Sequence, residues 1–423
     1  MITPASFLFL LAIPLSAAIL IWLTRGASAK LQRKRISQLG AINEKEILED
    51  PYEAIEPLAD LDWKTTEPIK IRPFKPKYHL TMALETCSLA DLVLVDKTYL
   101  SRIHIRRDCH VHHEPEVVQC NPAGVPAVNE FYEWMTTTYL PKRFPTMYQL
   151  SNHVVDEKAP TTPQVLRNLV TGEDIPVQPP NDPKAALKTL SSHVDCDFIF
   201  LLPTPSTMEP PSYPGPSFHP ASYQSSSGTS TPVDSTQDQP RYHLHAFMGT
   251  FPSGFNWLEK FSKPLASIHD PVPGYASKLE KSMDRFFATL PPGKIVQRRN
   301  WAVTTNRELF LVKGNHGDAI ASSSAPVTVA ETLEQQGGKD DEVNLKDTVL
   351  RAERQTLHRL PKTGALVFGF KTYQYELDDV KAEGSGEDLA QAIEGLWLGS
   401  VSKMVVYKKG DVWGKKVCEY LRS

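Results

Sequence analysis

Short alternating runs of apolar and polar residues in the second half of the chain predict an antiparallel sheet. Residues 351–360 and 365–377 show this alternation and are joined by Pro-Lys-Thr-Gly, which predicts a hairpin. Two apolar runs, 197–203 and 241–252, are expected to pair with each other, although a long polar segment separates them. Residues 300–312 are rich in β-branched and aromatic side chains, which predicts a further strand.

Two segments, 275–290 and 385–398, show the spacing of amphipathic helices. In the second, Ser385 is placed to cap the first turn, and Glu387 and Asp388 favour the positive end of the helix dipole. Helices packed on an antiparallel sheet define the α+β class, and this is the fold class that the pattern predicts.

The predicted strand at 351–360 is unusual because both of its faces are polar. Alternation places Glu353 and Gln355 on one face, and Arg354 and His358 on the other. One interpretation is an exposed edge strand that its charges protect from aggregation. The other is a strand that lines a polar pocket, and the pattern favours neither.

The chain begins with an apolar run. Residues 2–23 carry no charged side chain, and about 20 such residues span the hydrocarbon core of a bilayer as a helix. Basic residues follow this run and none precedes it, which predicts a single-pass membrane protein with its body in the cytosol, on an internal membrane such as the endoplasmic reticulum: Arg25, Lys30, Arg33, Lys34 and Arg35. The alternative is a cleaved signal peptide, because Ala27-Ser28-Ala29 resembles a cleavage site.

Composition divides the remainder of the chain. We expect a transmembrane anchor at 1–29, a polar juxtamembrane segment at 30–70 and one folded domain at 71–423. A Pro/Ser/Thr-rich stretch at about 204–240 has almost no aliphatic side chains and is predicted to be a disordered insert. A second polar insert is predicted at about 314–346.

Charge and cysteine content restrict the partners and the compartment. The 423 residues have a formal net charge of -3, which gives no reason to expect a nucleic-acid partner. The five cysteines are odd in number and widely spaced, which indicates a reducing compartment rather than a disulfide framework. They also lack the spacing of iron–sulfur ligands, and the chain shows no dinucleotide-binding loop. Electrons for any oxidation would therefore come from another protein.

Three long motifs carry a resemblance to a known family: "IHDPVPGY" (268–275), "RRNWAV" (298–303) and "LRAERQTLHRLPKTGALVFGFKTY" (350–373). They resemble the alpha subunit of haem-dependent oxidative N-demethylase, and more closely its fungal, HRQ-type relatives. The resemblance spans about 72–420 and implies a PAS-like antiparallel sheet with packed helices that binds haem, expected to be b-type. It also implies oxidative removal of a methyl group from a small amine, with O₂ and electrons from a separate flavin or iron–sulfur reductase.

The resemblance assigns cofactor roles to several residues. His269 is expected to be the axial ligand of the haem iron, held on a stiff, extended stretch because Pro271 and Pro273 fix their φ angles. The alternative is a loop histidine that bonds a backbone carbonyl. Arginines suit the haem propionates, and Trp301 is expected to stack near the macrocycle, unless it is plain core. The candidate arginines are Arg298, Arg299 and Arg354, and at most one of the first two faces the pocket, because neighbours on a strand point to opposite faces.

Glu353 and His358 are the candidates for catalysis, by binding the amine or relaying protons to bound O₂. Their opposite faces on the predicted strand mean that they do not act together. A rival metal site is offered by the segment 109–120, where His110 and His112 could share a strand face, although its spacing matches no zinc pattern and a solvated loop is the alternative. The two functional hypotheses are therefore a haem-dependent oxidising enzyme and a non-catalytic PAS-like haem or ligand sensor or scaffold.

Overall fold

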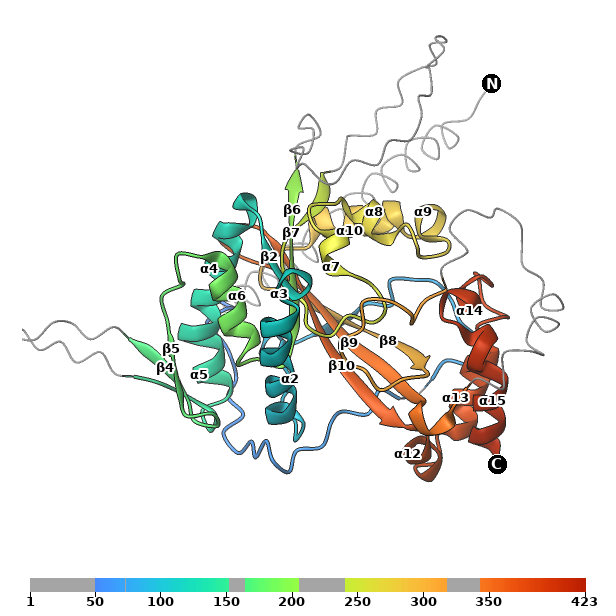
Figure 1. The fold of residues 1–423 in the computed structure, drawn as a ribbon. Helices are drawn as coiled ribbons and strands as arrows, with labels where there is room; N and C mark the ends of the chain where they lie inside the picture. The colour runs from blue at the N-terminus through green and yellow to red at the C-terminus, as the bar shows by residue number, and fades with distance from the viewer. Residues whose placement is uncertain (1–49, 73, 152–163, 205–239, 318–342) are drawn as a thin grey trace, which may run out of the picture. The chain divides into compact units, whose positions relative to one another are not determined.

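Most of the folded part of the chain can be followed in the structure, a computed structural model (Figure 1). It describes residues 50–72, 74–151, 164–204, 240–317 and 343–423. Residues 55–423 form one unit, which contains every element discussed below. The predicted inserts at 204–240 and 314–346 fall largely outside the described residues, so the insert and domain boundaries stay predictions.

A large antiparallel sheet carries the fold. Among the described residues, seven strands lie in the order β1-β8-β9-β10-β6-β7-β2, and each neighbouring pair is antiparallel. The strands are β1 (Glu85–Cys87), β2 (Val118–Cys120), β6 (Asp197–Thr204), β7 (Arg241–Met248), β8 (Ile295–Thr304), β9 (Val349–Arg359) and β10 (Leu366–Glu376). A separate small sheet has the order β3 (Tyr148–Leu150), β4 (Val165–Asn168), β5 (Glu173–Pro176).

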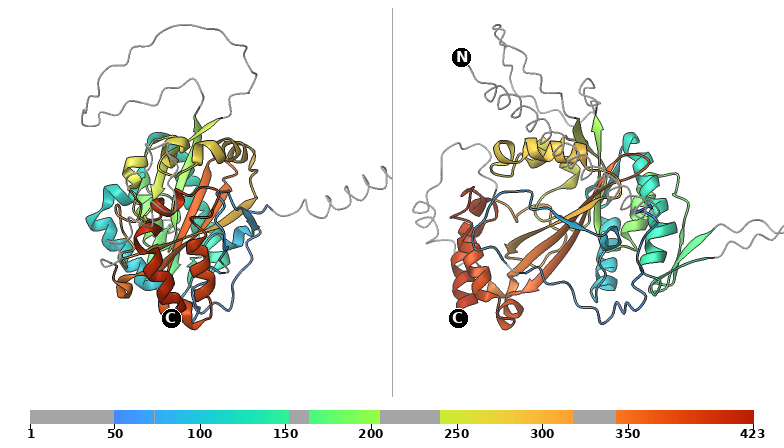
Figure 2. Two further views of the ribbon diagram at one scale, coloured as in Figure 1. Left: turned by 90° about the vertical axis from the view of Figure 1, so that its right-hand side faces the viewer. Right: turned by 180° about the vertical axis from the view of Figure 1, so that it is seen from behind.

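Helices surround the large sheet (Figures 1 and 2). The views show α2, α4 and α6 beside β6, and the C-terminal helices together at one end of β8, β9 and β10. The longer helices are α2 (Tyr99–His112), α4 (Val125–Trp134), α6 (Pro183–Ser191), α10 (Glu280–Thr289), α12 (Leu377–Ala382), α13 (Gly386–Glu394) and α15 (Gly410–Arg422). The short ones are α3 (Glu114–Val117), α5 (Leu140–Arg143), α7 (Trp257–Lys260), α8 (Leu265–His269), α9 (Tyr275–Lys278) and α14 (Met404–Tyr407).

Two predicted strand pairs are confirmed. β9 and β10 form the expected hairpin, whose turn is closed by the Leu360 amide donating to the Ala365 carbonyl at 2.8 Å. Gly364 has a φ of 69° in this turn, which glycine adopts without steric cost. β6 pairs with β7 across the long segment between them. The strand predicted at 300–312 begins earlier, at Ile295, and ends at Thr304, so the prediction is wrong for residues 305–312.

The polar strand β9 lies in the interior of the sheet, between β8 and β10. The edge-strand interpretation is therefore wrong. Glu353 and Gln355 face one side of the sheet and line a cavity there. Arg354 and His358 are buried on the other side, which α4 covers through ring contacts of Phe131. Both faces of β9 carry polar side chains, and both are covered by other parts of the chain. The alternation of residues within β9 does not reveal this.

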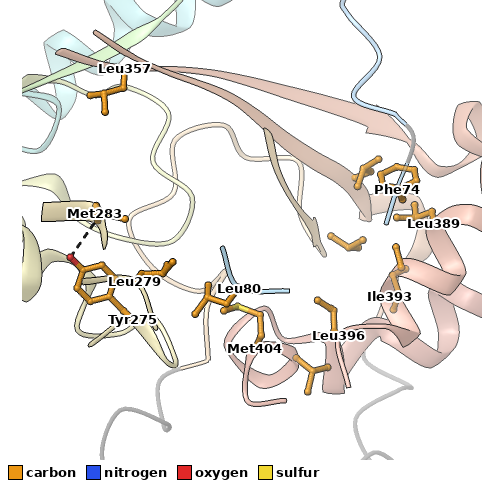
Figure 3. Close-up of a cluster of buried hydrophobic side chains, with 14 of the residues drawn as sticks. Phe74, Leu80, Tyr275, Leu279, Met283, Leu357, Leu389, Ile393, Leu396 and Met404 are labelled. Atoms are coloured by element: carbon orange, nitrogen blue, oxygen red, sulfur yellow. Dashed lines mark hydrogen bonds between the residues drawn. The ribbon is translucent and has the colours of Figure 1, made fainter. Parts of the chain in front are cut away.

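The predicted helices are present with shorter bounds. Residues 275–290 form two helices, α9 and α10, because the backbone at Leu279 departs from helical geometry, with a φ of -119°. α13 begins at Gly386 and ends at Glu394. Ser385 occupies the N-cap position of α13, but its side chain makes no capping hydrogen bond. Figure 3 shows Leu389 and Ile393 of α13 packing near Phe74, which lies in the segment before β1.

The predicted fold class needs one correction. The mixed architecture with a large antiparallel sheet is present, but in the described part of the chain no helix is long and apolar enough to cross a membrane. The longest described helix, α2, has 14 residues, about 21 Å at 1.5 Å per residue, which is shorter than a hydrocarbon core. The predicted transmembrane helix is therefore not part of the fold that the structure describes. The apolar run at 2–23 lies outside the described residues.

Candidate functional site

A cavity of about 860 Å³ lies against one face of the large sheet. This volume is within the range of small-molecule and cofactor sites. Its floor comes from β6, β8, β9 and β10, and its other walls come from residues 78–84, 253–287, 312–317 and 404–408. Figure 3 shows Leu357 of β9 on one side of this space and Leu80, Leu279 and Met404 on the other. Apolar side chains thus form much of the cavity wall, and polar and charged side chains lie both on the sheet and on the opposite walls.

His269 is the last residue of α8 and lines the cavity. Its Nδ1 lies 2.9 Å from the Leu265 carbonyl oxygen, and its ring stacks on Tyr275 with centroids 4.6 Å apart. Because a carbonyl only accepts, Nδ1 carries the proton in the neutral ring and Nε2 keeps its lone pair. Burial lowers the pKa of His269 to about 4, so the ring is neutral at pH 7. No described residue forms a hydrogen bond with Nε2 of His269.

The stretch after His269 is a turn, not the extended segment predicted from its prolines. The Val272 amide donates to the His269 carbonyl at 2.8 Å, and Asp270 has helical dihedrals (φ -46°, ψ -39°) although it precedes Pro271. That conformation is normally disfavoured before proline. The rigid support that the prolines suggested is therefore provided by a tight turn that places the ring on Tyr275.

Arg298 is on β8, opposite Gln355 of β9, and lines the cavity. Its guanidinium has neither a hydrogen bond nor an ion pair with any residue that the structure describes, and its Nε is buried. Burial lowers the pKa of Arg298, while Tyr78 and Glu353 act in the opposite direction. A guanidinium whose Nε is buried without an acceptor is costly, which makes Arg298 a candidate for binding an anionic group.

Glu353 lies opposite Asn300 on β8 and also lines the cavity. Gln355 donates through Nε2 to its Oε2 at 2.9 Å. Its other oxygen, Oε1, accepts no hydrogen bond from the described residues. Glu353 therefore offers one oxygen to a ligand in the cavity.

Trp301 lies at the edge of the cavity. Its ring meets Phe74 edge-on, with centroids 5.9 Å apart, and packs beside the small buried cluster that contains Ala352 and Tyr373. Its carbonyl accepts a hydrogen bond from the Lys408 ammonium. Trp301 thus contacts the hydrophobic core and also forms part of the cavity wall.

Three of the residues proposed from the sequence do not line the cavity. Arg299 points away on β8 and forms a 3.7 Å ion pair with Glu85 at the surface. Arg354 is buried on the opposite face, where its Nε donates to Gln297 at 2.9 Å. His358 is on that face too, between the rings of Phe131 and Trp134, and burial lowers its pKa to about 3. The structure therefore brings together His269, Arg298, Trp301 and Glu353.

Sequence reasoning missed three cavity residues, Lys408, Tyr407 and His316. Lys408 is only 4% exposed and donates to Asn300 Oδ1 at 3.2 Å. Burial lowers its pKa to about 8. His316 stacks on Tyr407 with centroids 4.5 Å apart, and burial lowers its pKa to about 4. Lys408 follows an apolar run at 404–407, which is a weak signal, and His316 falls in a segment that was predicted to be an insert.

The rival metal cluster does not assemble. His110 and His112 are on helix α2 rather than on a strand or in a loop. His110 bonds Ser191 and Ser192, and His112 bonds the Asp108 carbonyl. Among the residues with described positions, no group of three or more His, Cys, Asp or Glu side chains is arranged to hold a metal ion.

Comparison with known proteins bears on this cavity. The family model described as haem-dependent oxidative N-demethylase, alpha subunit-like, matches residues 83–418. The chain belongs to this family. The matched range contains nearly all of the segments that line the cavity. A search of curated proteins finds no match. Membership in the haem-dependent oxidative N-demethylase alpha subunit-like family indicates a haem cofactor, an activity of that type and a partner subunit or reductase.

The cavity residues fit a haem. A neutral imidazole with a free Nε2 is an axial ligand for haem iron, and a carbonyl-bonded Nδ1 fixes its tautomer and orientation. A partly buried guanidinium without a partner among the described residues suits a propionate. Apolar walls of leucine, methionine and phenylalanine side chains suit the macrocycle. The hydrogen bond to Leu265 is compatible with both earlier interpretations of His269, because it occupies only one of the two ring nitrogens.

Proposed function

We propose that the chain binds haem b in the 860 Å³ cavity and oxidatively demethylates an amine, using O₂ and electrons from a separate reductase. The observation that carries the proposal is the His269 ring, fixed through Nδ1 with Nε2 unbonded at the cavity wall. Family membership supports the cofactor and the type of reaction.

The chain's own residues have distinct tasks in this proposal. His269 holds the iron, and Arg298 binds a propionate through a guanidinium that has no acceptor among the described residues. Glu353 receives the amine N–H at Oε1, while Gln355 holds Oε2. The apolar walls exclude water from the reacting methyl group.

Bound haem would supply O₂ activation and the electron transfers that the side chains themselves do not provide. The overall change consumes the N-methyl amine, one O₂, two electrons and two protons, and it yields the demethylated amine, formaldehyde and one water. The electrons come from the reductase, and the oxidised carbon leaves as formaldehyde. A sensor or scaffold with the same cavity would bind haem without this turnover.

The test is haem binding by the full chain and its variants, measured as Soret absorption after haem titration. The unsubstituted protein is expected to show a Soret band, and His269→Ala to lose it or weaken it at least about tenfold, because the axial ligand is gone. Added imidazole is expected to restore the band in that variant. His110→Ala is the matched control, since His110 is also buried and neutral but bonds Ser191 away from the cavity.

An unshifted Soret band in His269→Ala would remove His269 from the iron, and no band in the unsubstituted protein would refute the haem proposal. If haem binds, formaldehyde release with an N-methyl amine, O₂ and a reductant separates the enzyme from a sensor.

A further inference from the structure

Lys408 is a buried cation held rigidly at the cavity wall. It lies between α14 and α15, and its carbonyl accepts a 3.1 Å hydrogen bond from Trp413 Nε1. Its ammonium donates to Asn300 Oδ1 at 3.2 Å and to the Trp301 carbonyl. The ammonium also lies 5.9 Å from the ring centroid of Tyr78 and 5.4 Å from that of Trp301. An ammonium has three N–H donors, and the third has no hydrogen-bond acceptor among the described residues.

The charges around Lys408 do not balance. Lys408 and Arg298 both line the cavity, and neither forms an ion pair with a carboxylate of the described chain. The Glu353 carboxylate raises the pKa of both Arg298 and Lys408, whereas the positive charge of Arg298 lowers the pKa of Lys408. Cations outnumber carboxylates around the cavity, and Arg351 and Lys408 are the buried ones among them: Lys260, Lys263, Arg298, Lys313, Arg351 and Lys408 against Glu259, Asp270 and Glu353. A buried charge that is not paired is strongly unfavourable, so a second anion is expected in the bound state.

This imbalance bears on the substrate. A simple alkylammonium would add a further positive charge to a space already rich in cations, which like-charge repulsion opposes. A substrate with its own carboxylate would neutralise Lys408 and leave Glu353 for the amine. If Arg298 binds a haem propionate as proposed above, Lys408 is a buried cavity cation that has no ion pair within the described chain and remains for the substrate.

We propose that the substrate is an N-methylated amine that also carries a carboxylate, and that Lys408 binds this carboxylate. The inference rests on the proposed function, because it places the substrate in the haem cavity. Leu80 and Met404, which lie beside each other in Figure 3, both line the cavity and offer apolar contacts to the carbon atoms between the two charged ends of the substrate.

The experiment compares two probes that differ only in the carboxylate, N-methylglycine and dimethylamine. Calorimetric titration of the full chain, with and without haem, gives the Kd of each. N-methylglycine is expected to bind at least about tenfold more tightly than dimethylamine, and Lys408→Met to abolish that preference. Lys408→Arg is expected to retain part of it. Lys263→Met is the matched control, since Lys263 also lines the cavity but is exposed.

Each outcome decides the inference. Equal Kd values for the two probes in protein that shows a Soret band would overturn it and leave the proposed function standing. If Lys408→Met weakens haem binding while the preference persists, the carboxylate at Lys408 is a propionate and the inference fails. If Lys408→Met does not fold, the probe pair on the unsubstituted protein and on Lys408→Arg still decides it. Absence of a Soret band refutes the proposed function, and with it the site in which this substrate would react.

Discussion

Two groups of charges in this protein, one buried and one partly buried, are built differently. The first lies beside α2 and comprises three cations and three carboxylates, Arg102, Arg106, Lys371, Asp96, Asp195 and Asp197, which we call the α2 charge cluster. Lys371 contacts Asp96 at 2.9 Å and Asp195 at 3.1 Å, and Arg106 contacts Asp197 at 2.6 Å. Every cation there has an acidic partner, as buried charges require.

The second group lines the cavity and comprises Arg298, Lys408 and Glu353. Here Arg298 and Lys408 make no ion pair within the described chain, and Glu353 is the carboxylate that raises the pKa of both. The contrast appears in the pKa values. Burial alone would raise the pKa of Asp195, but Lys371, Arg102 and Arg106 outweigh it and lower the value to about 2. In the cavity, burial is the largest influence and lowers the pKa of both cations.

The difference separates charges that stabilise the fold from charges that await a ligand. A balanced cluster contributes to stability without any bound molecule, and removing one member leaves its partners buried and unpaired. An unbalanced group costs stability in the empty protein and recovers it on binding. A comparison of the two groups therefore identifies a candidate ligand-binding site, which the presence of buried charges alone would not identify.

The same substitution in both groups gives the largest expected contrast. Arg106→Met is expected to lower the free energy of unfolding by about 3–5 kcal/mol, because Asp195 and Asp197 lose a buried partner. Arg298→Met is expected to change it by less than about 1 kcal/mol, or to raise it, because no ion pair is lost and an unpaired charge is removed. Urea unfolding of the two variants measures both values. Similar losses would show that Arg298 has a structural partner and that the comparison fails.

The buried, neutral side chain of His358 is expected to have a smaller effect on the free energy of unfolding, and this effect depends on pH. The folded-state pKa of His358 is about 3 because of burial, below the unfolded value of about 6.5. Below pH 6.5 the unfolded chain takes up a proton that the folded chain does not. The stability contribution is thus complete above pH 6.5 and is lost as pH falls toward 3.

His358→Phe keeps a ring between Phe131 and Trp134 but removes this titration. The slope of the unfolding free energy against pH, measured by urea unfolding between pH 4.5 and 6, is expected to fall by about 1.4 kcal/mol per pH unit. His112→Phe, at an exposed position of α2, is the matched control. An unchanged slope would mean that His358 titrates normally in the folded state. Retained haem in His358→Phe would agree with its place outside the cavity.

The hairpin of β9 and β10 was predictable because its signals are local, an alternating pattern and a Pro-Lys-Thr-Gly turn. The polar pocket beside β9 was predictable only as one of two interpretations. Alternation gives the faces of a strand but not what covers them. Whether β9 is an edge or a central strand depends on β8 and β10, which pair with it on either side.

Lys408 shows why the remainder of the site was not predictable. The sequence "YKKG" contains two adjacent lysines, of which Lys408 is buried and Lys409 caps α15 with a φ of 56°. Burial of the first depends on Asn300 and Trp301, more than 100 residues earlier in the chain. His316 likewise stacks on Tyr407, which belongs to a distant segment of the chain. Such contacts between distant segments leave no periodic signal in either one.

The smallest expected effect concerns the two adjacent arginines on β8, which sequence alone did not distinguish. Arg299 is 44% exposed and meets Glu85 at 3.7 Å, a surface pair of the kind that contributes about 0–1 kcal/mol. Arg299→Met is therefore expected to change the free energy of unfolding by no more than about 0.5 kcal/mol and to leave haem affinity unchanged. Arg298→Met, one residue earlier, is expected to weaken haem binding about tenfold, because a buried guanidinium is lost from the cavity. Haem titration of the two variants side by side measures this difference. Equal weakening in both would mean that general positive charge on β8, rather than the face to which each arginine points, attracts the cofactor.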